Sequence, residues 1–350
     1  MFKIQNTSIS PDHKPFVIAE MSGNHNQSLD RAFAIVDAAA EAGVHALKLQ
    51  TYTADTITFN GTSEEFVIHD QNSLWKNQNL HTLYQLAYTP WEWHKPIFDR
   101  AKAHGMLAFS SPFDTTAVDF LESLDVPCYK IASFENTDHI LLKKVAQTGK
   151  PVIMSTGVAS IADIQESVAV LRKNGCKDLV LLKCTSTYPA TPESTNLLTI
   201  PHMRELYGCQ IGLSDHTMGI GAAVAAVALG ARVLEKHFTL SRADGGVDSS
   251  FSLEPEELKN LVIESERAFL AMGNVSYTLS EKEQKSLQYK RSLYVVEPMQ
   301  AGDIFSEKNV RSIRPSNGLH TRYYEEILGK TATQTIDAGT ALNWAMISPT

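Results

Sequence analysis

The sequence lacks the features that mark a membrane protein or a disulfide-stabilised secreted protein. None of its apolar runs reaches the ~18 residues that a membrane span needs. The polar start at residues 1–6 does not have the shape of a signal peptide. The four cysteines, at positions 128, 176, 184 and 209, never occur in Cys-x-x-Cys spacing, which argues against a zinc ribbon and fits reduced thiols. We therefore expect a cytoplasmic protein.

The sequence also lacks an excess of positive charge. It has 31 lysines and arginines against 39 aspartates and glutamates, a formal net charge of -8, so no surface for nucleic acid is expected. An anionic small substrate remains compatible with this balance, because lysines can gather at one rim of an acidic surface. With 350 residues, the chain is long enough for a barrel of roughly 250 residues and a small second domain.

Short apolar runs rich in β-branched residues recur through most of the chain, with helical intervals between them. Eight such runs are the expected strands, at residues 16–20, 46–50, 106–110, 128–133, 152–155, 179–183, 211–216 and 232–237. Ahead of six of them a glycine is expected to close the preceding helix, at Gly43, Gly105, Gly149, Gly175, Gly208 and Gly230. This repeat predicts an α/β fold, a (β/α)8 TIM barrel.

One interval departs from the repeat. Between the second and third expected strands, Thr51 to Leu80 contains polar residues and an Asn60-Gly61 turn signal but no long hydrophobic period. An insertion of this size is usually functional when it lies over an active site, so we interpret it as a lid or substrate wall. A plain surface excursion is the alternative.

The barrel is predicted to end at residue 274, after an amphipathic helix that begins near Pro255. The lysine- and glutamate-rich residues 275–290 are the predicted linker. Short strand-like runs separated by turn signals follow, which is typical of a small β-rich unit. The predicted organisation is therefore a TIM-barrel catalytic domain over residues 1–274 and a β-rich domain over residues 291–350.

Two consecutive expected strands carry the residues around which we interpret the chain. The runs 211–216 and 232–237 each end with a carboxylate and a histidine, and the segment between them is long enough for one crossover helix. The strands are therefore parallel and present His216 and His237 side by side at one rim. Two satisfied core histidines are the alternative. A pair of imidazoles with open positions suits a divalent ion of the manganese, iron or cobalt type, acting as a Lewis acid on a carbonyl.

Polar residues follow the ends of the other expected strands, and in a barrel all of them are expected to face one site. They are Glu20, Lys48, Gln50, Ser110, Ser111, Lys130, Ser133, Ser155, Thr156, Lys183, Thr185, Ser186, Ser214, Asp215, His216, Glu235, Lys236 and His237. The four lysines must meet anions, because an unpaired charge inside an apolar strand is costly. Lysines among hydroxyls suit a phosphate and a carboxylate, and ion pairs with Glu20, Glu135 or Glu235 are the alternative. A carbonyl site beside such lysines indicates addition of a phosphorylated enol to an aldehyde.

Several segments carry a resemblance to a known family. They are Phe16 to Glu20 with Asn24-His25, Lys48 to Gln50, Ser111 to Phe113, residues 129–133, Ser155 to Gly157, residues 184–189, residues 212–217 and Glu235 to Phe238. Over nearly the whole chain they resemble the sialic acid synthase family. The resemblance implies condensation of phosphoenolpyruvate with an N-acetylated aldose to a nine-carbon nonulosonic acid and phosphate. It also implies that the small C-terminal domain has the antifreeze-like, or SAF, fold.

The resemblance also implies roles for individual residues. His216 and His237 would bind Mn2+, and Glu20 would lie near the reacting carbons as a third catalytic residue. The implied ligands of phosphoenolpyruvate are Lys48, Ser111, Lys130, Ser133, Ser155, Ser186, Tyr188 and Ser214. The implied ligands of the acceptor sugar are Gln50, Glu135, Asp248 and Arg314. Dimers of the family place the turn with Arg314 over the neighbouring chain's barrel, so a domain-swapped homodimer is implied.

Within the family, the chain resembles the branch whose acceptor is 2,4-diacetamido-2,4,6-trideoxy-L-altrose. The segments that carry this likeness are Gln50-Thr51-Tyr52-Thr53 and residues 89–94, 109–113 and 314–320. Compared with the N-acetylneuraminate branch, Ser186 stands where asparagine is expected and Ser111 where threonine is expected. A synthase of N-acetylneuraminate or legionaminate, with another N-acetylated aldose as acceptor, is the alternative.

Two other classes of protein fit less of the sequence. A metal-dependent amidohydrolase would need a His-x-His at the end of the first expected strand, where Ala19-Glu20-Met21 stands. A non-catalytic ice- or carbohydrate-binding protein is suggested only by analogy with the fold of the C-terminal domain. The dense polar rim argues against both.

Overall fold

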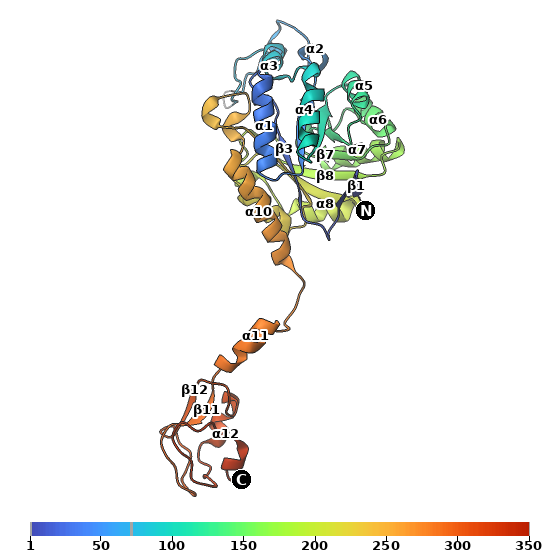
Figure 1. Cartoon of the computed structure of the whole chain (residues 1–350). Coiled ribbons are helices and arrows are strands. Elements are labelled where there is room, and N and C mark those ends of the chain that lie inside the picture. The colour runs from blue at the N-terminus through green and yellow to red at the C-terminus, as the bar shows by residue number, and fades with distance from the viewer. Residues whose placement is uncertain (1, 71–72, 350) are drawn as a thin grey trace. The chain divides into compact units, whose positions relative to one another are not determined.

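The chain folds into two compact units, Met1–Gly273 and Asn274–Thr350, drawn in Figure 1. The computed structural model describes residues 2–70 and 73–349, so residues 71 and 72 of the predicted excursion and the two terminal residues lie outside it. Among the described residues, no helix combines the length and apolar character needed to cross a membrane.

The first unit is built on eight parallel strands that close into a barrel (Figure 1). They are β3 (Phe16–Glu20), β4 (Ala46–Thr51), β5 (Leu107–Pro112), β6 (Tyr129–Ile131), β7 (Val152–Ser155), β8 (Leu179–Cys184), β9 (Gln210–Asp215) and β10 (Val233–His237). Strands that follow one another in sequence are neighbours in space, and β10 pairs with β3 to close the ring. The predicted (β/α)8 barrel is confirmed.

Helices follow the strands and lie outside the ring (Figure 1). They are α1 (Leu29–Glu41), α4 (Trp91–Ala103), α5 (Thr115–Ser123), α6 (His139–Gln147), α7 (Ile161–Lys173), α8 (Thr199–Tyr207), α9 (Gly221–Ala228) and α10 (Pro255–Met272). All six glycines expected to close a helix have a positive φ, from 60° at Gly208 to 113° at Gly175. A Cβ atom makes this conformation costly, so these glycines end the helices and turn the chain into the next strand.

A hairpin precedes the barrel. Its strands β1 (Phe2–Ile4) and β2 (Thr7–Ile9) are antiparallel, and their apolar side chains are buried in the same core as the barrel strands. Gln5 at its turn lines a small cavity together with Met106 and Pro127, which stand just before β5 and β6. The hairpin therefore lies at the amino ends of the strands, and the opposite mouth of the barrel is left for function.

The interval after β4 is irregular, as expected. It contains the short helix α2 (Ala54–Ile57), the 3-10 turn η1 (Glu64–Phe66) and the helix α3 (Leu80–Ala87). The indole nitrogen of Trp75 donates a hydrogen bond to the carbonyl of Val247, 3.2 Å away, in the loop after β10. We call residues 52–88 the excursion, and this hydrogen bond ties it to the loop after β10, two strands away around the barrel.

Further 3-10 turns shape the loops at the carboxyl ends of the strands. They are η2 (Ser133–Glu135), η3 (Pro192–Ser194), η4 (Arg242–Asp244) and η5 (Ser249–Phe251). Such turns place several side chains near one point without the length of a full helix.

The second unit is the small β-rich domain that the sequence predicts. Its strands β11 (Ser292–Val295) and β12 (Val310–Ile313) form an antiparallel pair, and isolated bridges such as Met299 with Ile336 extend the pairing. Its helical elements are α11 (Glu281–Ser286), η6 (Leu287–Tyr289), η7 (Thr321–Tyr323), α12 (Tyr324–Ile327) and η8 (Trp344–Met346). Leu293, Phe305 and Ile327 belong to a core of its own.

Candidate active site

A cavity of about 520 Å³ lies among residues from the carboxyl ends of the barrel strands, the loops that follow them and the excursion. It is lined by seven of the residues predicted to act on a ligand, namely Gln50, Ser133, Glu135, Ser186, Tyr188, His237 and Asp248. Nine described residues of the excursion after Tyr52 also line it, including Trp75 and Tyr84. The excursion therefore forms a wall of the cavity.

His216 and His237 lie side by side, with ring centroids 5.3 Å apart. Nδ1 of His216 is 2.9 Å from the carbonyl oxygen of Thr185, so this nitrogen carries the proton and Nε2 is left as a ligand atom. Nδ1 of His237 is buried without a hydrogen-bond partner among the described residues and lies 3.7 Å from Oδ2 of Asp248. Burial, which penalises the charged form, holds the pKa of His237 well below its usual value, and the charge of Lys48 adds to this shift, so the ring is neutral.

These two rings fit a metal ion. In the described part of the chain, no group of three or more His, Cys, Asp or Glu side chains is placed to hold one. The protein would therefore contribute two imidazoles, and water or substrate oxygen would complete the coordination. A buried imidazole nitrogen without a partner, beside a second ring of fixed tautomer, is a suitable donor set for a first-row divalent ion.

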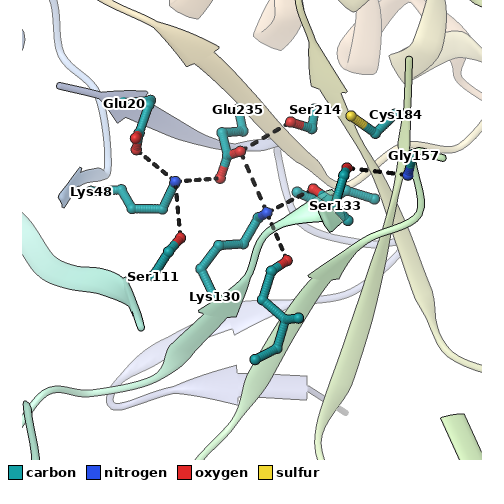
Figure 2. Close-up of polar contacts among 12 residues, drawn as sticks. Glu20, Lys48, Ser111, Lys130, Ser133, Gly157, Cys184, Ser214 and Glu235 are labelled. Atoms are coloured by element: carbon teal, nitrogen blue, oxygen red, sulfur yellow. Dashed lines mark hydrogen bonds and ion pairs between the residues drawn. The ribbon is translucent and has the colours of Figure 1, made fainter. Parts of the chain in front are cut away.

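Figure 2 shows four buried charged side chains, Glu20, Lys48, Lys130 and Glu235. Nζ of Lys48 is 2.6 Å from Oε2 of Glu20 and 3.8 Å from Oε2 of Glu235, and Nζ of Lys130 is 3.7 Å from Oε1 of Glu235. Burial raises the pKa of Glu20 and lowers the pKa of Lys130, because it penalises the charged forms. Burial opposes ionisation of Glu235 too, but Lys130 and Lys48 outweigh it and lower the pKa of that carboxyl. Lys48 and Lys130 therefore form the ion pairs with Glu20 and Glu235 that the sequence offered as the alternative to an anionic ligand.

A ring of serines surrounds the lysines. Five consecutive strands, or the loops directly after them, each supply one, namely Ser111, Ser133, Ser155, Ser186 and Ser214. Lys48 donates to Oγ of Ser111 over 3.2 Å, as Figure 2 shows. Lys130 donates to Oγ of Ser155 over 2.6 Å. Oγ of Ser214 donates to Glu235 over 3.0 Å. Two ammonium groups among five hydroxyls suit the phosphate and carboxylate of an anionic ligand.

Gly157 completes the serine ring, and sequence reasoning did not single it out. Its backbone N–H donates to Oγ of Ser133 over 3.2 Å (Figure 2). A Cβ atom at this position would lie 2.1 Å from Oγ of Ser186 and 2.7 Å from Oγ of Ser133. The position therefore needs glycine because of space. The available signal was its place directly after Ser155-Thr156, at the end of a strand.

The expectation that all polar rim residues face one site is wrong. Side chains alternate between the two sides of a strand, so neighbours of the site residues point away from it. Lys236 donates to Oδ2 of Asp215 over 3.0 Å and also to the carbonyl of Thr217. Ser110 shares a 2.6 Å hydrogen bond with the hydroxyl of Thr51. These contacts belong to the packing around the barrel rather than to the cavity.

The expectation that each rim lysine meets an anion is also wrong, because, in the part of the chain that the structure describes, Lys183 contacts only neutral acceptors. Its Nζ donates to the carbonyl of Cys184 over 2.9 Å and to Oγ1 of Thr185 over 3.2 Å. It makes no ion pair within the described residues. The side chain is only half-buried, so water and two neutral acceptors satisfy its ammonium group.

Three of the residues predicted to hold the acceptor, Gln50, Glu135 and Asp248, line the cavity. Gln50 donates to Oε1 of Glu20 over 2.9 Å, and Asp248 accepts a hydrogen bond from Ser22. Oε2 of Glu135 is buried without a partner among the described residues, and burial raises the pKa of Glu135 to about 7. Glu135 therefore has a free oxygen to offer a ligand, and its carboxyl changes between the protonated and charged forms near neutral pH.

Two predicted ligands need separate mention. The ring of Tyr188 lies against His216, with centroids 4.6 Å apart, and 6.0 Å from the ring of Trp75. Arg314 belongs to the second unit, where it is exposed and makes no hydrogen bond or ion pair with any described residue. The structure thus brings the predicted residues of the first unit together and leaves Arg314 free to reach a ligand or another chain.

Comparisons with known proteins match both units. The NeuB family pattern matches residues 35–277, and the SAF domain pattern matches residues 290–348. The pseudaminic acid synthase of Campylobacter jejuni subsp. jejuni is 44% identical over 335 residues, which cover 96% of this chain and 97% of that protein. The N,N'-diacetyllegionaminic acid synthase of the same organism is 37% identical over 324 residues, covering 92% of this chain and 96% of that protein.

Solved structures agree with this match. The N-acetylneuraminic acid synthetase of Leptospira borgpetersenii superposes with a TM-score of 0.71 and 32% identity. The superposition covers 82% of this chain and 95% of that one.

Proposed function

The chain belongs to the NeuB family, and from that premise we propose that it is a pseudaminic acid synthase. It condenses phosphoenolpyruvate with 2,4-diacetamido-2,4,6-trideoxy-L-altrose to give pseudaminic acid and phosphate, as a transferase that forms a carbon–carbon bond. The observation that carries the proposal is a cavity lined by Gln50 and His237. Gln50 links it through Glu20 to the buried Lys48, and His237 belongs to the histidine pair. The same cavity supports the alternative of a legionaminate or N-acetylneuraminate synthase with another N-acetylated aldose.

Phosphoenolpyruvate binds at the lysine and serine end. Its phosphate and carboxylate replace Glu235 as the partner of Lys130 and share Lys48 with Glu20. The ligands of this anion are Lys48, Ser111, Lys130, Ser133, Ser155, Ser186, Tyr188 and Ser214. Because both lysines are buried, water does not screen their attraction for the ligand.

The aldehyde end of the acceptor lies at His216 and His237. A divalent metal, Mn2+, held by these two imidazoles supplies Lewis-acid polarisation of the carbonyl when it is bound. The enol carbon attacks the aldehyde carbon, water adds to carbon two of the former phosphoenolpyruvate, and phosphate leaves with cleavage of its carbon–oxygen bond. Glu20, fixed by Gln50 and Lys48, positions or deprotonates this water.

The acceptor sugar is held by Gln50, Glu135 and Asp248 of the same chain and by Arg314 of a second chain. The exposed, unpaired guanidinium of Arg314 supports this part of the proposal, since a planar donor suits a ligand carbonyl. The active form is then a domain-swapped homodimer, and each site needs two chains.

An acceptor panel tests the activity. Phosphate release from phosphoenolpyruvate is measured with the 2,4-diacetamido acceptor, with its stereoisomers and with N-acetylmannosamine. We expect the highest kcat/KM for the L-altrose acceptor. A higher value for a stereoisomer or for N-acetylmannosamine would replace the proposed function with the alternative.

Subunit mixing tests the arginine. Chains carrying His237→Ala and chains carrying Arg314→Ala should each be inactive, and mixing them under exchange should restore about a quarter of wild-type activity. In a mixed dimer, the barrel with intact histidines receives the partner's intact arginine. Exchange shown by differently tagged chains, without return of activity, would place Arg314 in cis or outside the site.

A further inference from the structure

The position of the histidine pair fixes which groups of the acceptor meet which wall of the cavity. In the proposed function, on which this inference rests, the aldehyde carbon lies at His216 and His237. The carbons farther along the sugar then extend away from the strand ends, and the excursion supplies the opposite wall. Substituents on carbon four therefore lie against the excursion, whereas those on carbon two stay nearer the histidines.

Two tyrosines of this wall have unused hydroxyl groups. Tyr52 and Tyr84 both line the cavity, and neither hydroxyl makes a hydrogen bond to any residue that the structure describes. Tyr52 is only 3% exposed. Neither hydroxyl oxygen is enclosed without a partner, so both are open to the cavity and can donate a hydrogen bond to a ligand there.

The two rings are held in place by each other and by a third aromatic side chain. The ring of Tyr52 meets Tyr84 edge-on at 5.6 Å and Phe113 edge-on at 5.1 Å. Edge-on contacts of this kind fix the direction of each ring and therefore of its hydroxyl. The pair is a rigid feature of the cavity wall even without a hydrogen bond.

The elements that carry the two tyrosines separate them along the cavity, because Tyr52 directly follows β4 whereas Tyr84 lies on α3. Burial raises the pKa of Tyr52, and Asp248, beside His237, adds to this shift. Burial also raises the pKa of Tyr84, and there the added contribution comes from Glu135. Both hydroxyls thus stay protonated donors at neutral pH, with Tyr52 at the histidine end and Tyr84 on α3 of the excursion.

We propose that Tyr84 is a specificity-determining residue, whose hydroxyl donates a hydrogen bond to the acetamido carbonyl on carbon four of the acceptor. The hydroxyl of Tyr52 donates the corresponding hydrogen bond to the acetamido carbonyl on carbon two. Two unpartnered donors at two depths of one cavity match a sugar that carries two acetamido groups. An acceptor without the second acetamido group leaves the Tyr84 hydroxyl unpaired and is used less well.

The test compares two acceptors that differ only at carbon four. One is the 2,4-diacetamido acceptor and the other is its 4-deoxy analogue, which keeps the acetamido group on carbon two. For each enzyme, the discrimination ratio is kcat/KM for the first acceptor divided by kcat/KM for the second. Tyr84→Phe keeps the ring and its contacts, so the ratio should fall by about tenfold while the KM for phosphoenolpyruvate stays the same.

Two further variants make the test specific. Tyr52→Phe should lower kcat/KM for both acceptors by a similar factor, because both carry the group on carbon two. Tyr277→Phe, a change at a tyrosine that is 98% exposed in the second unit, is the matched control and should leave the ratio unchanged. The unfolding temperature of each variant shows that a lower kcat/KM does not come from a loss of fold.

The outcomes separate this inference from the activity on which it rests. Wild-type turnover of the diacetamido acceptor with an unchanged ratio in Tyr84→Phe overturns the role of Tyr84 and leaves the proposed function standing. Failure of the wild-type enzyme to use that acceptor overturns the proposed function and this inference together. A tenfold fall in the ratio confined to Tyr84→Phe supports both.

Discussion

The two ends of the cavity are built from different kinds of structure. At the anion end, the side chains come from β4 to β10 or the first residues after them, and the lysines are fully buried. At the acceptor end, half of the wall comes from an excursion without a hydrophobic period. Strands hold reacting groups to a fixed geometry, whereas a loop can change its side chains without altering the barrel. The comparison teaches that strands hold the lysines and serines in place, whereas the excursion, which faces the sugar in the proposed function, can vary without altering the barrel.

Burial follows the same division. In the anion end, Lys48 and Lys130 are at most 3% exposed. In the excursion, Phe59 is 71% exposed and Leu74 is 48% exposed. The strand ends therefore enclose their side chains more completely than the described part of the excursion does.

Removal of the histidine pair should give the largest effect. His237→Ala, or thorough chelation of the wild-type enzyme, should lower kcat by about a thousandfold or more, because Lewis-acid polarisation of the carbonyl is lost. Circular dichroism should show an intact fold, since the barrel core does not depend on this ring. Full turnover by a metal-free preparation would contradict the assignment and move the chemistry away from the strand ends.

Lys130→Met should give the next largest effect. The substitution keeps the stem and removes the charge, so the KM for phosphoenolpyruvate should rise by about 10- to 100-fold, with the acceptor KM changing less. Initial rates measured with each substrate varied in turn separate the two constants. An unchanged KM for phosphoenolpyruvate would make Lys130 a structural partner of Glu235.

Gly157→Ala tests the anion end without a change of charge. The added methyl group would overlap the space used by Ser186 and Ser133, so the KM for phosphoenolpyruvate should rise by about tenfold. Gly221→Ala is the matched control, because a Cβ there meets nothing within 4 Å. Equal effects of Gly157→Ala on the KM of both substrates would show that the change spreads beyond the anion end.

Trp75→Phe should give the smallest effect, and this effect should be on the KM for the acceptor rather than on the KM for phosphoenolpyruvate. The ring is retained, but the hydrogen bond to the carbonyl of Val247 is lost, so the acceptor KM should rise by about threefold. The KM for phosphoenolpyruvate should not change. A larger effect on phosphoenolpyruvate than on the acceptor would break the division between the two ends.

The barrel could be predicted from the sequence because its signals are local. Apolar runs of strand length and a glycine such as Gly208 at the end of a helix recur at regular intervals, and each has a direct physical cause. The two histidines could be placed together for the same reason, since consecutive parallel strands end at one rim. No long-range information was needed to predict that these two histidines are close together.

The prediction of the site did not use the alternation of side chains along a strand, although this alternation is also a local signal. Ser110 and Ser111 are adjacent on β5, yet only Ser111 meets Lys48. Lys236 and His237 are separated in the same way on β10. A period of two applied to each strand would have removed the outward residues from the predicted site.

The excursion could not be predicted in the same way. The positions of Trp75 and Tyr84 depend on contacts with Val247 and Tyr52, which are remote in sequence or lie on another element. No short-range pattern encodes such contacts. The expectation of a wall over the site came from the length of the interval alone, and the residues that form this wall needed the structure.

The pairing of Lys48 and Lys130 with Glu20 and Glu235 has a consequence for folding and, in the proposed function, for the release of phosphate. The formal charges of the four groups cancel, and a proton moved from a lysine to a glutamate stays within the cluster. A newly synthesised chain can therefore bury this cluster before it has met any substrate. In the proposed function, the incoming anion must displace Glu235 and Glu20 as partners of the lysines. When phosphate leaves, these carboxylates pair with the lysines again, so no buried charge is left unpaired.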